Sequence, residues 1–169
     1  MNFNQLQNAV HDWIKSMVVA LNAQGTPADM VAVGNEISDG CLFPDGRASD
    51  GAKFAALIGA GCQAVREFNP QTQIMLHHSL GRKNSAVVPW VDNFLKHGVS
   101  FDVIGMSCYA EAKPGDFKQN FDDLAVRYPH LTFAAAEYSH KKRYLNDLIF
   151  NTANEKGIGS IIWEPTRWR

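Results

Sequence analysis

Short apolar segments alternate with longer segments of helical spacing along the whole chain, and this alternation limits the possible folds more than any other feature. Segments rich in β-branched or small apolar residues predict five strands, at residues 29–36, 73–79, 101–109, 131–139 and 158–165. Helical spacing predicts a helix before the first strand and one in each gap, at residues 3–25, 53–68, 88–98, 116–128 and 144–157. This order is typical of parallel strands joined by helical crossovers.

Two architectures share this order, an open doubly wound sheet and a (β/α)8 TIM barrel. The last three predicted strands end in Tyr109, Glu137 and Trp163. Because side chains alternate along a strand, Glu137 is expected on the same face as Ala135, above small or apolar residues that fill an interior. Functional groups at the ends of several strands favour a barrel with its site at the carboxyl rim, whereas an open sheet carries its site at one switch point.

Chain length conflicts with a complete barrel. The chain has 169 residues and five predicted strands, whereas an eight-stranded barrel takes about 250 residues and at least roughly 200. We therefore expect one α/β domain over residues 1–169, an incomplete (β/α) barrel that contains strands 4 to 8 with their helices and lacks strands 1 to 3. Such a sheet has an open edge with exposed apolar surface, through which the chain is expected to aggregate or self-associate.

Composition excludes several classes of protein. With 16 Lys and Arg against 17 Asp and Glu, the chain has no basic field, so neither nucleic acid nor an anionic membrane is expected as a partner. No apolar run approaches the roughly 18 residues of a membrane helix, and residues 1–10 do not resemble a signal peptide. The three cysteines lack CxxC spacing, which predicts neither a disulfide framework nor a zinc site.

Two glutamates, Glu36 and Glu137, end apolar strands. A carboxylate beside a hydrophobic strand is costly unless it has a task or a partner. In a barrel both side chains would reach the same mouth, where a pair of carboxyl groups suits glycoside hydrolysis, one as proton donor and one as nucleophile. Asn35 is placed to bind a sugar hydroxyl beside the cleaved bond. The alternative is that each glutamate only pairs with a nearby Lys or Arg.

The ordered motifs resemble glycoside hydrolase family 53, the arabinogalactan endo-β-1,4-galactanases. The resemblance rests on a valine-rich strand ending in Gly-Asn-Glu, an Ile-Met-Leu-His strand, a Phe-Asp-Val-Ile-Gly-x-Ser-x-Tyr strand and a later strand ending in glutamate. It implies a (β/α)8 barrel and an endo-acting, retaining reaction by double displacement. Glu36 then matches the acid/base at the end of strand 4, Glu137 the nucleophile at the end of strand 7, and Asn35 the asparagine that contacts the sugar.

The resemblance also suggests supporting residues. His77 matches the family's strand-5 histidine, whereas His78 is expected to point the opposite way. Tyr109 either hydrogen-bonds the nucleophile or is an ordinary rim tyrosine, and Trp163 either stacks on a sugar or caps the core. Glu164 either binds hydroxyls or orients its neighbours. The connection after Glu137 offers no acidic run for calcium, so we expect neither a metal nor a cofactor.

The implied partner is a polysaccharide, the galactan side chains of pectin, and by resemblance the location is extracellular or periplasmic. Residues 110–116 depart from the family, which leaves the glycan and its subsites open. Two other functions are considered. One is a non-catalytic carbohydrate-binding or inactive remnant of a glycosidase barrel. The other is a flavodoxin-like nucleotide-binding sheet, which would need a Gly-rich phosphate loop after the first strand, and the residues GNEISDG do not form one.

Overall fold

The computed structural model describes residues 1–109, 115–139 and 142–165. Helices alternate with strands as the sequence predicts. The elements, in chain order, are α1 (Phe3–Ala23), β1 (Met30–Ala32), η1 (Ile37–Asp39), α2 (Gly51–Phe68), β2 (Gln73–His78), α3 (Asn84–Lys96), β3 (Val103–Ser107), α4 (Gly115–Arg127), β4 (Thr132–Tyr138), α5 (Lys142–Phe150), η2 (Ala153–Glu155) and β5 (Gly157–Ile162). Within these described ranges, none of the helices combines the length and the hydropathy that a membrane span requires.

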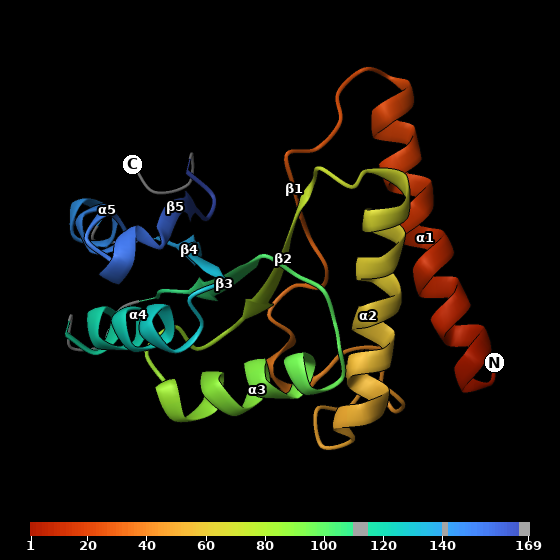
Figure 1. Cartoon of the computed structure of the whole chain (residues 1–169), viewed down its shortest axis with the longest axis horizontal. Coiled ribbons are helices and arrows are strands. Elements are labelled where there is room, and N and C mark those ends of the chain that lie inside the picture. Colours follow the sequence, from red (N-terminus) through yellow and green to blue (C-terminus); the bar gives the residue numbers. More distant parts are fainter. Residues whose placement is uncertain (110–114, 140–141, 166–169) are drawn as a thin grey trace.

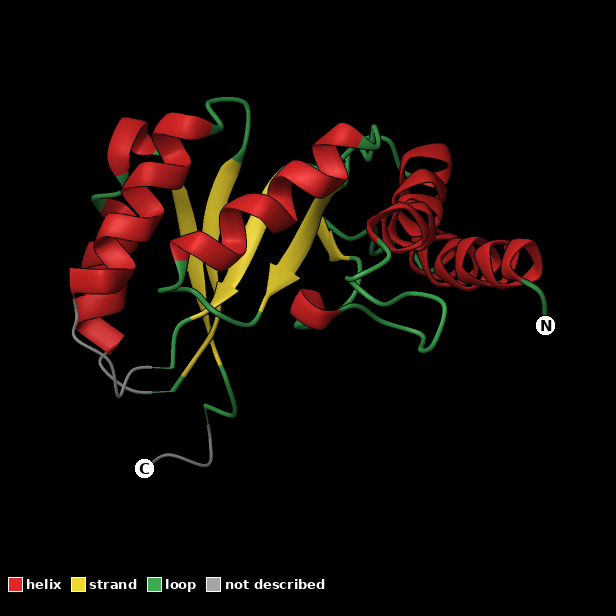
Figure 2. Cartoon of the chain, turned by 90° about the horizontal axis from the view of Figure 1, so that it is seen from below, coloured by secondary structure: helices red, strands yellow, loops and turns green. Residues whose placement is uncertain are grey.

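The five strands are parallel and lie side by side in chain order, β1-β2-β3-β4-β5. The helices form an arc around the strands (Figure 1) and pack on one face of the sheet (Figure 2). A flavodoxin-like sheet would reverse its strand order at a switch point, and these strands show no reversal. The prediction of an incomplete TIM barrel is therefore confirmed, with β1 and β5 as the edges of the described sheet.

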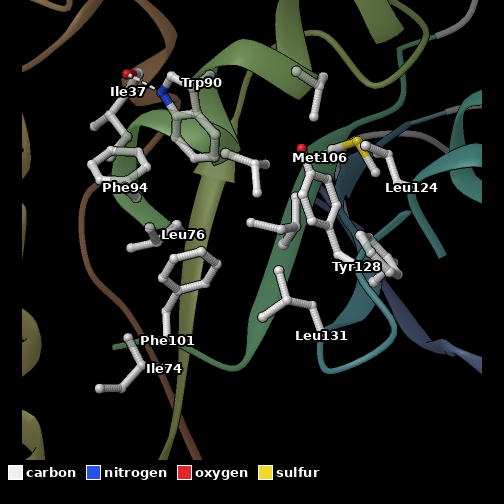
Figure 3. Packing of buried hydrophobic residues seen from close by; sticks show 14 of the residues in the cluster. Ile37, Ile74, Leu76, Trp90, Phe94, Phe101, Met106, Leu124, Tyr128 and Leu131 are labelled. Atoms are coloured by element: carbon white, nitrogen blue, oxygen red, sulfur yellow. Dashed lines mark hydrogen bonds between the residues drawn. The ribbon is translucent and has the colours of Figure 1, made fainter. Parts of the chain in front are cut away.

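The two faces of the sheet carry different apolar layers. A large cluster fills the space between the strands and the helices, where Leu76 from β2 and Met106 from β3 meet Trp90 and Phe94 from α3 (Figure 3). A smaller cluster lies on the other face, which is the interior side of a barrel, and consists of Met30, Met75, Val103, Ala134 and Ala136. The interior layer supports the carboxyl ends of the strands from below.

One expectation about β4 is wrong. Ala135 packs in the outer cluster against the helices, so strict alternation would turn Glu137 outward as well. Instead the register slips: Met106 pairs with Ala135, and the next residue, Ser107, pairs with Glu137. This β-bulge inserts Ala136 as an extra residue, and Ala136 and Glu137 both face the interior side.

Two predicted helix boundaries also differ. Helix α3 starts at Asn84 instead of residue 88, so Pro89 lies inside the helix. Pro89 is the sixth residue of this helix, beyond the first turn, and so removes an N–H that would otherwise bond to the carbonyl of Ser85. Helix α5 ends at Phe150, because Thr152 is already extended, with φ of −61° and ψ of 138°, before the short helix η2.

Candidate active site

Glu36 lies on a turn beyond the end of its strand. β1 stops at Ala32, because Gly34 and Glu36 have positive φ angles of 85° and 47°, which an extended strand cannot accommodate. A side chain at Gly34 would also come within 2.7 Å of Ile37. The carbonyl of Ile37 accepts a 3.2 Å hydrogen bond from the Trp90 indole. The turn is thus anchored at Ile37, the residue after the exposed Glu36.

The buried side chain of His77 is the centre of a hydrogen-bond network. His77 is the last residue of β2 that faces the interior side, where its Nδ1 lies 3.1 Å from the amide oxygen of Asn35 and its Nε2 lies 2.9 Å from the hydroxyl of Ser107. Ser107 in turn donates a 2.5 Å hydrogen bond to Glu36 Oε1. Burial lowers the pKa of His77 against the opposing effect of Glu137 and Glu36, so the ring is neutral near pH 7.

His78 points the opposite way, as expected. Its ring meets the Trp90 ring edge to face, with centroids 5.1 Å apart, in the layer between sheet and helices. Its Nδ1 accepts a hydrogen bond from the backbone N–H of Leu80. His78 is therefore a core residue and does not contribute to the site formed around His77.

Glu137 is held by Tyr109. The phenol oxygen of Tyr109 donates a 2.7 Å hydrogen bond to Glu137 Oε2. Removal from water and the adjacent Glu137 carboxylate raise the pKa of Tyr109, which therefore stays protonated as a donor. Tyr109 itself is 43% exposed, so this pair lies at the open rim and not in the core.

The structure brings the two glutamates together at one rim. One carboxylate oxygen of Glu36, one of Glu137 and one ring nitrogen of His77 lie within 4.8 Å of one another. These are also three potential metal ligands. Both nitrogens of His77 already have hydrogen-bond partners, so an ion would break one of these contacts, and we assign no metal here.

Two residues that directly follow β5, Trp163 and Glu164, lie at the same rim. Trp163 is 49% exposed and follows Ile161, which is 54% exposed, whereas Ile162 between them packs on the outer cluster. Trp163 and Ile161 therefore face the interior side. Glu164 is half-buried, and its charge contributes to the raised pKa of Tyr109, which places it near that phenol.

Ser107 is a site residue that the sequence interpretation missed. The sequence contained a signal for it, because Ser107 precedes Tyr109 by two residues and shares its face of the strand predicted at residues 101–109. Residues 110–114, most of the segment that departs from the family, lie outside the described residues.

Comparisons with known proteins identify relatives of this arrangement. The model of glycosyl hydrolase family 53 matches residues 1–141. An uncharacterized protein in the bgaB 5' region of Niallia circulans is 33% identical over 138 residues, covering 76% of this chain and 38% of that protein. An arabinogalactan endo-beta-1,4-galactanase of Thermothelomyces thermophilus is 30% identical over 180 aligned positions, covering 86% of this chain and 54% of that protein.

Solved structures agree with this result. The Ignisphaera aggregans GH53 catalytic domain superposes with a TM-score of 0.90 and 25% identity, covering 96% of this chain and 55% of that one. A fungal beta-1,4-galactanase superposes with a TM-score of 0.86 at 22% identity, covering 97% of this chain and 60% of that one. The chain thus spans about half the length of these relatives.

Proposed function

The chain belongs to glycosyl hydrolase family 53, and on that premise we propose that it is the part of an endo-acting, retaining glycoside hydrolase that carries both catalytic carboxyl groups. Glu36 serves as acid/base and Glu137 as nucleophile. The observation that carries the proposal is the approach of the two carboxylates within 4.8 Å, atom to atom, at one rim. Retaining enzymes keep their carboxyl groups about 5–5.5 Å apart, whereas inverting enzymes need roughly 6.5–9.5 Å to admit a water.

The proposed reaction has two displacements. In the first, Glu137 attacks the anomeric carbon while the bond to the glycosidic oxygen breaks, and Glu36 gives its proton to that oxygen. In the second, water attacks the same carbon, Glu36 takes a proton from the water, and Glu137 leaves. Two inversions at one carbon restore its configuration. The hydrogen bond from Tyr109 to Glu137 Oε2 leaves the other oxygen available for the attack.

Four further residues have proposed roles in binding the sugar. Asn35 contacts a hydroxyl beside the cleaved bond, and His77 holds Asn35 in place through Nδ1. The exposed indole of Trp163 stacks on a sugar face. Glu164, near Tyr109, accepts hydrogen bonds from hydroxyl groups.

The proposed substrate is β-1,4-galactan or arabinogalactan, such as the galactan side chains of pectin, at an extracellular or periplasmic location. The names of the relatives support it, since several are called arabinogalactan endo-beta-1,4-galactanases. We propose further that residues 1–169 form one partial barrel corresponding to strands 4 to 8. Within the described residues β1 and β5 are the edge strands of the sheet, and we propose self-association through such edges.

One observation favours a second candidate, a non-catalytic carbohydrate-binding or inactive remnant. The chain spans about half of its relatives, so contacts that a complete barrel makes to the sugar from its other strands are not among the described residues. Binding of galactan without hydrolysis would identify this second function.

The experiment compares three variants by release of reducing sugar from galactan. Glu36→Gln and Glu137→Gln are each expected to lose activity by at least about 10²-fold, since each removes one participant in the chemistry. Glu67→Gln on the exposed face of α2 is the matched control and should keep full activity. Proton NMR of the first product should show the β-anomer. Hydrolysis that survives both rim substitutions would refute the assignment, and an α-anomer would refute retention.

A further inference from the structure

Glu36 is held in place by a residue from a different strand. Its own strand ends four residues earlier, at Ala32, and its backbone lies on a turn, so the chain alone leaves the carboxyl group free to swing. The contact that fixes it comes from Ser107, which is 3% exposed at the end of the central strand β3. A group on a buried strand is more precisely placed than a group on a turn.

The contacts around Ser107 close a ring. His77 reaches Asn35 through Nδ1 and Ser107 through Nε2, and Ser107 reaches Glu36, the residue that follows Asn35. Both members of the Asn35–Glu36 pair are therefore tied to one buried imidazole. Strands β2 and β3 lie side by side, with His77 paired to Gly105, so the ring rests on the sheet register.

The direction of the hydroxyl proton follows from this ring. A serine hydroxyl has one proton, and here it is donated to Glu36 Oε1. Ser107 Oγ must then accept from His77 Nε2, which requires the tautomer with a proton on Nε2. In that tautomer of the neutral ring, Nδ1 is an acceptor. The side-chain amide of Asn35 donates an N–H to it when the amide is turned by 180°, which exchanges the positions of its oxygen and nitrogen.

We propose that Ser107 is a positioning residue for Glu36: its hydroxyl, oriented by His77, occupies Oε1 and thereby places the catalytic proton on Oε2. The proposal rests on the acid/base role of Glu36 argued above. An oxygen that already accepts the hydroxyl proton of Ser107 is the less basic of the two, so the other oxygen delivers the proton to the glycosidic oxygen and later accepts one from water. Without Ser107 either oxygen can carry the proton, and the carboxyl group loses its fixed direction.

The first test needs no turnover and uses the whole chain. The imidazole nitrogens of isotope-labelled His77 are followed by NMR across a pH titration. Groups facing His77 are Glu36 and Glu137, with His78 next to it on β2. Because the charges of both Glu36 and Glu137 act on the ring, the step is read in the Glu137→Gln background. There we expect a step in the His77 shifts that persists with Ser107→Thr, is reduced with Ser107→Ala, and disappears with Glu36→Gln. Ser79→Ala, which removes a rim hydroxyl bonded to Ser38 instead, is the control. A step unchanged in Ser107→Ala overturns the proposal.

The second test separates positioning from folding by the leaving group. Ser107→Ala should lower kcat on galactan by about 10- to 100-fold, part of what general acid catalysis contributes. The leaving group of a dinitrophenyl galactoside needs no proton, so with this substrate the loss in the rate of the first displacement should nearly vanish. In the second displacement azide should restore turnover, because it attacks in place of water and needs no base. Equal losses on both substrates overturn the positioning role.

The two tests also distinguish this proposal from the proposed function. If the wild-type chain hydrolyses nothing, the proposed function fails for this chain, while the NMR step still decides whether Ser107 couples His77 to Glu36. If Glu36→Gln and Glu137→Gln abolish hydrolysis but His77 shows no step that depends on Glu36, the proposed function stands and the positioning role of Ser107 is refuted.

Discussion

Acid should destabilise this fold through His78. The ring is 2% exposed, packs edge to face on Trp90, and accepts the backbone N–H of Leu80 at Nδ1. Burial, with a smaller contribution from His77, lowers the pKa of His78 to about 4 from 6.5. Protonation would place a charge in an apolar layer and remove the acceptor for Leu80, so the folded chain resists it.

The sign and size of the effect follow from linkage. The unfolded chain binds a proton at His78 below about pH 6.5, whereas the folded chain binds it only near pH 4. The free energy of unfolding therefore falls as the pH falls through this window. Each unit of difference between the pKa of His78 in the unfolded and the folded chain corresponds to about 1.36 kcal/mol. The free energy of unfolding therefore falls by about 3 kcal/mol over the whole window. That is a large part of the stability of a small domain.

The assay is urea unfolding between pH 7 and pH 4, followed by tryptophan fluorescence. His78→Asn keeps an acceptor near the position of Nδ1 but cannot titrate. Between pH 7 and pH 4 its free energy of unfolding should therefore fall by about 3 kcal/mol less than that of the wild type. It will be less stable at pH 7, because it loses the ring contact with Trp90. His130→Asn, at an exposed position, should keep the wild-type slope. An unchanged slope in His78→Asn would refute the reasoning.

Three further outcomes are expected, each measured as the change in the urea midpoint at pH 7. Phe94→Ala removes a fully buried ring that contacts three other aromatic rings and should cost about 3–5 kcal/mol; a loss under 1 kcal/mol would mean that the layer collapses around the gap. Gly105→Ala places a methyl group 2.5 Å from the sulfur of Met75 and should cost about 1–3 kcal/mol, partly recovered by adding Met75→Ala; no recovery would contradict this clash. Asp102→Ala removes the shared acceptor of Arg66 and of a β2 backbone N–H and should cost about 1–2 kcal/mol, given its partial exposure; a loss that vanishes in high salt would show a surface ion pair only.

The alternation of apolar and helical segments was enough to predict the order of the elements, because each segment has a strong local period. The choice of a barrel also followed from the residues at the strand ends, and the sequential strand order confirms it. Predicted boundaries were less accurate where special backbone conformations occur. The strand expected to reach Glu36 stops at Ala32, since the positive φ angles that follow depend on contacts with distant residues such as Trp90.

The site was predictable only in part, for a physical reason. Glu36 and Glu137 lie close together at one rim, as expected for residues at strand ends of a barrel, and His77 lies beside them. The inward direction of Glu137, however, depends on a bulge that alternation alone does not reveal. Ser107 was missed because a serine in an apolar strand looks like a small core residue until its neighbours across the sheet are known.

The reacting groups Glu36 and Glu137 and the groups that orient them come from four neighbouring strands and the turns that follow them, between residues 35 and 137. The hydrogen bonds described among these groups are all made within this one block of sequence. A chimera that joins this block to the opposite half of another family member should keep the bond-breaking chemistry and take its preference for sugar and chain length from the donor of that half. Reaction type and substrate choice can then change separately in the evolution of such barrels.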